Sequence, residues 1–250
     1  MEEQAPSAPT ISLSDIIINV FSSPAEAFEG IRTSPARATV WLIPLIALLL
    51  LSAASIWTVF SNDTLRDQAL QSQKERIQEQ VRTGQMPQER ADQALEQMEG
   101  GGGMMAAIGI VFGSLTLAVV FFVTALFFWL IGKFALKAEG GYGKYLELWG
   151  ASQWISVLGG IITLLMIVSM NSVYAAPNGA LAVLQNFNRL DTTHRILSSL
   201  NIFTIWQMVV VGIGLSKFAG KPSGTGIGAA MGVWVAWVLV SVFALAGLGM

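Results

Sequence analysis

Residues 39–60 read TVWLIPLIALLLLSAASIWTVF, an apolar run without a single charged side chain. A helix needs about 20 residues to cross a hydrocarbon core about 30 Å thick, so this run is long enough to span a membrane. Four more runs follow, and the five begin near Thr39, Met104, Tyr145, Leu200 and Gly226. Lipid offers no partner to backbone polar groups, so each run is expected to be helical. The sequence predicts an all-α, polytopic membrane bundle of five transmembrane helices.

The composition supports this class and excludes several functions. Of the 250 residues, 53% are hydrophobic and 12% are charged, whereas soluble domains carry roughly 25% charged residues. The net charge is −2 and no basic stripe is present, which argues against a nucleic-acid partner. Cysteine is absent and His194 is the single histidine. We therefore expect no disulfide, no thiolate or histidine metal site and no cofactor.

The segment before the first span is expected to be mostly helical. Residues 1–11 are rich in Pro, Ala and acid and are predicted to be a disordered tail, so the membrane domain is taken as 12–250. Ser12-Leu-Ser-Asp15 and Ser23-Pro-Ala-Glu26 are capping boxes that predict one or two amphipathic helices over 12–33. They would lie on the membrane surface or pack on the bundle itself, and both alternatives stay open. The polar, acidic start favours a retained signal-anchor at 39–60 over a cleavable signal peptide.

Residues 61–103 differ in kind from the spans. Asn62-Asp63 can cap a polar helix, the stretch 83–86 breaks it, and Pro87 starts a second helix. The second helix has an apolar stripe at i, i+3, i+4 and i+7, formed by Ala91, Ala94, Leu95 and Met98. This pattern predicts an antiparallel helical hairpin outside the bilayer. Gly100 to Gly103 are expected to form a flexible joint rather than a phosphate loop, since no Gly-Lys-[Ser/Thr] follows.

Orientation follows from the lysines of the short turns. The turns at 133–144 and 217–222 carry lysines close to their helices, opposed only by Glu139. Because short-loop Lys and Arg mark the cytoplasmic side, we expect a cytoplasmic N-terminus. The hairpin at 61–103 and the C-terminus are then extracytoplasmic.

Ionisable groups within spans are the usual pointers to function, and the five runs hold almost none. Glu147 lies one turn from Lys144 at the start of the third run, where an interfacial surface carboxylate is favoured over a proton relay. Gln153, Asn201 and Gln207 are, with Glu147, the candidate interhelical polar contacts. Such hydrogen bonds are worth about 0.6 kcal/mol each on average.

Two further patterns are a pair of GxxxG motifs and an Asp–His pair. Gly109-x-x-x-Gly113 and Gly228-x-x-x-Gly232 match the small-residue spacing that lets helices approach closely; packing within the chain and dimerisation both remain open. Asp191 and His194 are interpreted as a helix cap and an exposed histidine rather than an acid–base pair, because no nucleophile motif accompanies them.

The arrangement resembles bacterial members of the Yip1 domain family. The resemblance covers about residues 12–248 and rests on FSSPAEAF (21–28), the GQMPQE turn (84–89), LNIFTIW (200–206) and Gly212-Ile-Gly214. It implies a five-helix integral protein of the bacterial cytoplasmic membrane with a cytoplasmic N-terminus. No catalytic residues are carried over from it. Eukaryotic relatives act in vesicle traffic and contact small GTPases; their Asp-Leu-Tyr-Gly-Pro signature is absent here, so that partner is not carried over.

The functional hypothesis is a non-enzymatic membrane scaffold or adaptor, accessory to a transport or trafficking complex. Its expected partners are the lipid bilayer and another membrane protein or a second copy of the chain. The alternative is a small-solute transporter or permease subunit. In that case a polar path would run between the third and fourth spans along Gln153, Asn201 and Gln207.

Overall fold

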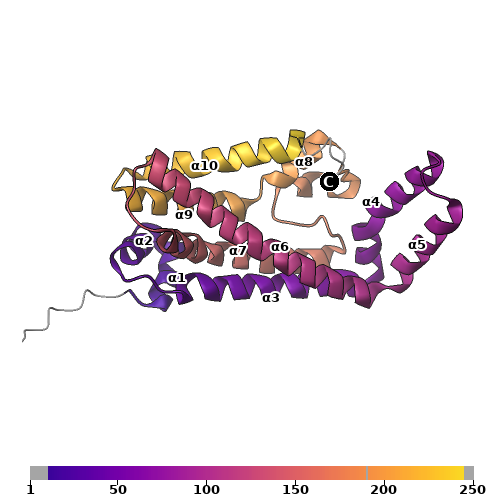
Figure 1. The fold of residues 1–250 in the computed structure, drawn as a ribbon, viewed down its shortest axis with the longest axis horizontal. Coiled ribbons are helices and arrows are strands. Elements are labelled where there is room, and N and C mark those ends of the chain that lie inside the picture. The colour runs from indigo at the N-terminus through magenta and orange to yellow at the C-terminus, as the bar shows by residue number, and fades with distance from the viewer. Residues whose placement is uncertain (1–10, 190, 245–250) are drawn as a thin grey trace, which may run out of the picture.

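The computed structural model describes residues 11–189 and 191–244. Apart from an isolated bridge between Asn178 and Asn201, every regular element in these ranges is helical. Five helices of the described residues are long and apolar enough to cross a membrane, which confirms the predicted all-α membrane bundle (Figure 1). They are α3 (Thr39–Ser61), α6 (Gly102–Leu130) continued by the π-helix η1 (Ile131–Ala135), α7 (Tyr142–Met170), α9 (Ile202–Ala219) and α10 (Ser223–Leu239) continued by the π-helix η3 (Val240–Ala244).

The glycine run 100–103, predicted to be a flexible joint, is mostly helical in the structure. Helix α5 (Gln88–Gly100) ends where the run begins and α6 starts at Gly102, so only Gly101 interrupts them. The Gly101 carbonyl already accepts the Met105 N–H at 2.8 Å. A Cβ on Gly102 would lie 2.9 Å from Arg66 Nη1. The second span consequently covers 34 residues, about 50 Å at 1.5 Å per residue, and its first turns extend toward the hairpin.

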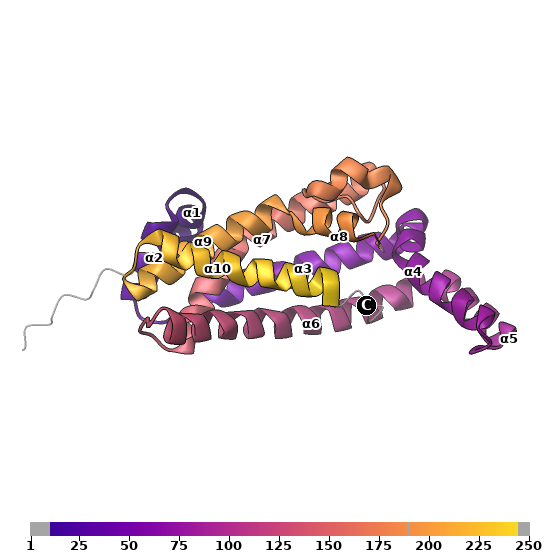
Figure 2. The ribbon, with the colours of Figure 1, turned by 90° about the horizontal axis from the view of Figure 1, so that it is seen from above.

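Helices α1 (Leu13–Ser22) and α2 (Pro24–Thr33) lie against one end of the bundle (Figure 2). Their inward side chains are at most 1% exposed: Ile16, Val20, Ala27, Phe28 and Ile31. Helix α2 contacts α9 and α1 contacts α7. Of the two alternatives left open, packing on the bundle is what the structure shows, while Ile18 on α1 remains 61% exposed. The predicted tail lies outside the described residues except Ile11, which packs against the core.

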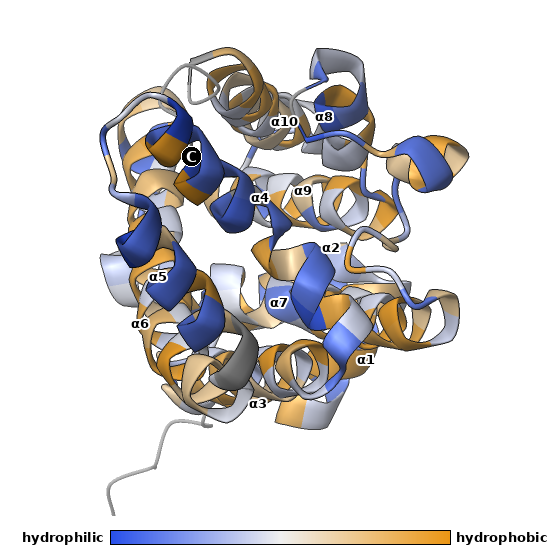
Figure 3. Ribbon diagram, turned by 90° about the vertical axis from the view of Figure 1, so that its right-hand side faces the viewer, coloured by the Kyte–Doolittle hydropathy of each residue, from blue (hydrophilic) through white to orange (hydrophobic). Residues whose placement is uncertain are grey.

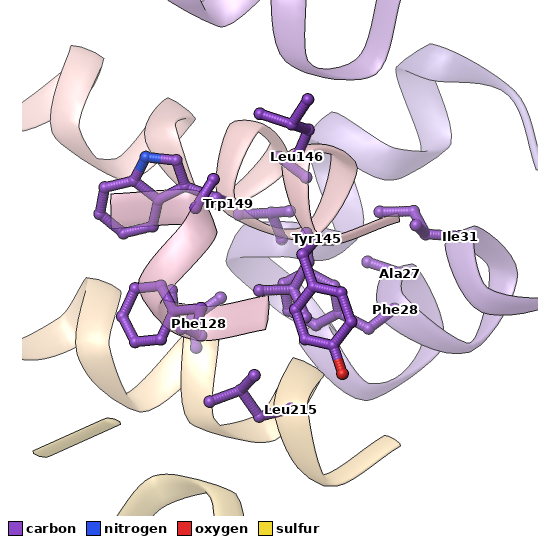
Figure 4. Packing of buried hydrophobic residues seen from close by; sticks show 14 of the residues in the cluster. Ala27, Phe28, Ile31, Phe128, Tyr145, Leu146, Trp149 and Leu215 are labelled. Atoms are coloured by element: carbon purple, nitrogen blue, oxygen red, sulfur yellow. The ribbon is translucent and has the colours of Figure 1, made fainter. Parts of the chain in front are cut away.

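The core is densest where α2, α6, α7 and α9 meet (Figure 4). Tyr145 and Phe28 are fully buried there, and the Tyr145 ring meets Phe218 edge-on at 5.4 Å between centroids. Phe128 packs beside Trp149 with ring centroids 5.4 Å apart. Aromatic pairs of this kind add about 0.5–1.5 kcal/mol beyond area burial, so these two pairs help to hold α6 and α9 against α7.

The opposite end carries the polar elements. Helix α4 (Asp63–Arg82) and α5 form the hairpin, and η2 (Gly179–Asn186) and α8 (Thr192–Ser199) fill the connection between α7 and α9. Figure 3 views the molecule from this end and shows the hairpin as mostly hydrophilic against the hydrophobic spans. The predicted end of the fifth span, Leu248, lies outside the described residues.

Candidate functional site

The hairpin after the first span is the largest polar feature of the molecule. Asn62 caps α4 by accepting the Leu65 N–H at 3.1 Å, and Gly84, at φ +71°, reverses the chain before α5. Leu65 is 1% exposed, and on the predicted stripe Ala91 and Met98 are 2% and 6% exposed. The two-helix hairpin is therefore confirmed, with its apolar side covered and its polar side open.

Gln68 fastens the hairpin to the end of the third span. Its side-chain amide donates to the Asn171 carbonyl at 3.1 Å, and its carbonyl accepts the Val173 N–H at 3.0 Å. Asn171 ends α7 in the left-handed conformation at φ +50°. The nitrogen and the oxygen of the Gln68 side-chain amide thus both hydrogen-bond to the backbone turn that follows α7. Nothing in the sequence pattern indicated this contact, because it joins segments about 100 residues apart.

The outer faces of the hairpin carry charges of both signs. Arg66 pairs with Asp63 at 2.8 Å and Arg82 with Glu79 at 2.6 Å. Hydrogen bonds from the Arg82 guanidinium hold the pKa of Glu79 below its usual range. Exposed pairs contribute at most about 1 kcal/mol, so these charges add little to the stability of the fold.

Glu147 is not the surface carboxylate that its position predicts. It is 2% exposed and pairs with Lys144 at 2.8 Å. Its other oxygen accepts the Arg37 backbone N–H at 2.5 Å. The prediction was wrong because the chain between α2 and α3 folds over this carboxylate, which the sequence alone does not reveal.

Lys144 belongs to the same group of polar contacts as Glu147. Its ammonium donates to the Ile31 carbonyl at 2.7 Å and to the Ser34 carbonyl at 2.6 Å, as well as to Glu147. These carbonyls lie at the end of α2, where no further helical N–H reaches them. The Lys144–Glu147 pair therefore locks the α2–α3 linker onto the start of the third span, and every polar atom of the two charged groups has a structural use.

Gln207 joins the third and fourth spans. Its carbonyl oxygen accepts the Ser156 hydroxyl at 2.8 Å, and its amide nitrogen lies 3.4 Å from the Ser152 hydroxyl. Gln207 and Gln153 are each 5% exposed, but the Gln153 side chain makes no hydrogen bond to another described residue. The Gln207 cluster is a small, closed interhelical network rather than a row of free polar groups.

Asn201 acts as a helix cap instead of an interhelical contact. Its side-chain oxygen accepts the N–H groups of Phe203 at 2.9 Å and Thr204 at 3.3 Å, which opens α9. The expected role fails because the fourth span starts at Ile202, two residues later than Leu200, and leaves Asn201 at the N-cap.

The two GxxxG motifs behave differently. A Cβ on Gly109 or Gly113 would meet Ile56 of α3 at 3.2 or 3.0 Å, whereas Gly228 and Gly232 face open space. The first motif thus packs within the chain and the second lies on the outside of α10. The contact between α9 and α10 instead uses Gly226, whose added Cβ would clash with the Gly212 carbonyl oxygen; the GxxxG spacing did not indicate this position.

The connection between α7 and α9 is compact. Asp191 caps α8 as predicted by accepting the His194 N–H at 2.9 Å, a bond that lowers the pKa of Asp191. His194 is partly buried rather than fully exposed: its Nδ1 accepts the Asn188 N–H at 2.9 Å and its ring stacks on Phe187 with centroids 5.7 Å apart. Within residues 11–189 and 191–244, no three His, Cys, Asp or Glu side chains gather as a metal site would require.

Comparisons with known proteins place the chain in a family. The sequence model of the Yip1 domain matches residues 18–245, from the first pre-helix to the last span. Searches of curated proteins and of solved structures returned no significant match. The matched range contains the second half of α1, all of α2, the hairpin and all five candidate spans described above, and on this match the chain belongs to the Yip1 domain family.

Proposed function

We propose that this protein is a non-enzymatic membrane scaffold or adaptor whose hairpin binds another membrane protein. The observation that carries the proposal is the hairpin itself: 20 and 13 residues of helix stand beyond the spans with a polar outer face. Gln68 holds this element in a fixed orientation against the end of α7. A rigid, exposed helical pair costs little to order on binding, so it is well suited to present a docking surface.

The proposal includes an orientation and a location. Lys137, Lys217 and Lys221 lie in the turns at the α2 end of the bundle, and short-loop lysines favour the cytoplasmic side. We place the N-terminus in the cytoplasm, the hairpin and the C-terminus outside it, and the protein in a bacterial cytoplasmic membrane. A partner would then meet the hairpin at the outer surface.

The outward glycines of α10 offer a second contact within the membrane. Gly228 and Gly232 have no neighbour within 4 Å of an added Cβ, and such surfaces let another helix approach closely. A partner span, or α10 of a second copy, is proposed to use this face, whereas Gly109 and Gly113 are occupied by α3.

Photo-crosslinking tests the adaptor role. A benzoylphenylalanine at Arg76 or Arg90, both exposed on the hairpin, is expected to capture one discrete membrane protein in native membranes. The matched control is the same probe at Leu115, which is 60% exposed on the flank of a span and should label mainly lipid. Capture from Leu115 but not from either hairpin position would contradict the proposal.

The transporter alternative makes a different prediction. The Gln207 cluster is satisfied within the protein, so the purified protein in liposomes is expected to carry no solute or ion flux. Gln207→Ala should lower thermal stability only slightly, since one interhelical hydrogen bond is worth about 0.6 kcal/mol. A flux that Gln207→Ala abolishes would replace the adaptor with a permease; stopped-flow assays on both proteins decide between them.

A further inference from the structure

Two adjoining hollows lie where α2, the turn after η1 and the α9–α10 turn meet. These elements are at the end of the bundle that Figure 1 draws on the left. One has a volume of about 390 Å³ and the other about 450 Å³. They share Arg32, Phe218 and Gly220. They therefore form one continuous depression at the rim of the bundle.

Positive charge dominates the lining. Five cations, Arg32, Lys137, Lys144, Lys217 and Lys221, face two carboxylates, Glu29 and Glu139. Arg32 is paired with Glu29, and Lys144 with the buried Glu147. Among the described residues, Lys137, Lys217 and Lys221 have no ion pair within 4 Å. The depression keeps unneutralised positive charge on both of its sides.

The positive charge of Lys217 acts on Glu29 inside the depression. Hydrogen bonding from Arg32 is the main cause that holds the pKa of Glu29 below its usual range, and the charge of Lys217 adds to it. Glu29 is thus kept ionised and engaged with Arg32, and it offsets part of the charge of Lys217. An incoming anion would meet Lys217 and Lys221 first.

Aromatic side chains set the depth of this site in the membrane. Trp129 and Tyr142 meet edge-on at 6.4 Å between centroids near the same end, and the Lys133 ammonium lies 4.9 Å from the Trp129 ring centroid. Trp and Tyr gather at the level of lipid headgroups. The depression lies where these helices end, so it faces headgroups rather than acyl chains or bulk water.

The geometry also offers neutral donors and an apolar wall. Helix α10 starts at Ser223 after Pro222, whose side chain cannot cap it. The N–H groups of Thr225 and Gly226 are bonded to the Pro222 carbonyl and Ser216 Oγ, which leaves those of Ser223 and Gly224 for a ligand. Ser223 lines the second hollow, and Phe218 lines both. A ligand with an anionic oxygen cluster and an adjacent apolar part matches this combination.

We propose that the depression binds the phosphodiester headgroup of an anionic phospholipid, through Lys217, Lys221 and the start of α10. Basic pockets between transmembrane helices suit such headgroups. Free phosphate shares the anion chemistry but lacks the acyl chains that hold a lipid in the bilayer beside this end of the bundle. The site is separate from the hairpin and adds lipid selection at the other end of the molecule.

Native mass spectrometry of the full chain in mild detergent tests the proposal. Phosphatidylglycerol is expected to bind at least tenfold more tightly than phosphatidylcholine. Lys217→Gln/Lys221→Gln should weaken phosphatidylglycerol binding about 25-fold, at about fivefold per lysine. The charge-matched control Arg76→Gln/Arg90→Gln, at the hairpin, should bind as the unmodified protein does.

A single-site variant and a competition with inorganic phosphate complete the test. If the double variant does not fold, Lys221→Gln alone, which changes an exposed side chain, should still weaken binding about fivefold. Inorganic phosphate at millimolar concentration should not displace the lipid. Equal binding of the two lipids, or full binding by folded lysine variants, overturns the proposal; displacement by inorganic phosphate overturns the lipid assignment in favour of a free anion.

Discussion

Glu147→Ala is expected to lower the free energy of unfolding by about 3 kcal/mol, because removing one partner of a buried ion pair strands the other. Lys144 would keep its two carbonyl acceptors, Ile31 and Ser34, but lose its counter-charge. The Arg37 N–H would lose its acceptor as well. Titration with a denaturing detergent measures the loss, and hydrogen exchange should report an opened linker between α2 and α3.

The neighbouring carboxylate Glu139 provides the control for this prediction. It is exposed and lies in the turn before α7, so Glu139→Ala should leave stability within about 0.5 kcal/mol of the unmodified protein. If Glu147→Ala is as mild as Glu139→Ala, the buried pair does not hold the linker.

Gly226→Ala is the second large expected effect. A Cβ there would lie 2.5 Å from Ser216 Oγ and 2.7 Å from the Ser216 backbone nitrogen, with the Gly212 carbonyl also in its way. Backbone atoms cannot move aside, so α9 and α10 would have to separate, which typically costs about 1–3 kcal/mol or more. The Gly226 N–H bond to Ser216 Oγ, 2.8 Å long, would be disturbed too. A lower melting temperature in detergent is the readout.

Gly228→Ala, two residues further on, is the matched control. Nothing lies within 4 Å of its added Cβ, and alanine is the better helix former by about 1 kcal/mol. Its melting temperature should stay the same or rise. Equal destabilisation by both substitutions would show that glycine flexibility, rather than close contact, matters in α10.

Local sequence signals predicted the elements of this fold well. Uninterrupted apolar runs identified the spans, and short capping patterns at Ser12, Asn62 and Asp191 each accept an N–H of the helix they begin. These signals act over a few residues, so a single sequence is sufficient to read them. The order of elements, hairpin included, follows from them.

Long-range contacts could not be predicted in this way. Glu147 looks interfacial until the α2–α3 linker, about 110 residues earlier in the chain, covers it. Asn201 looks like an interhelical group until the exact start of α9 makes it a cap. GxxxG spacing pointed to Gly228, while the true close approach at Gly226 depends on which face α10 turns toward α9. Each of these three contacts depends on how the helices are placed relative to one another, which the periodicity of a single helix does not reveal.

The two ends of the bundle have different proposed roles. The α2 end is locked by the Lys144–Glu147 pair and holds the basic depression, whereas the far end presents the hairpin. A rigid bundle between them suits a scaffold that fixes one partner relative to the membrane surface.

Affinity purification from native membranes, with the intact protein and a deletion of residues 62–99 compared by mass spectrometry, tests the central claim most directly. The account predicts that the intact protein recovers one membrane-protein partner in stoichiometric amount, and that the deletion variant stays folded but loses it. Recovery of the intact protein alone, or of the same partner with the deletion variant, would contradict the adaptor role of the hairpin.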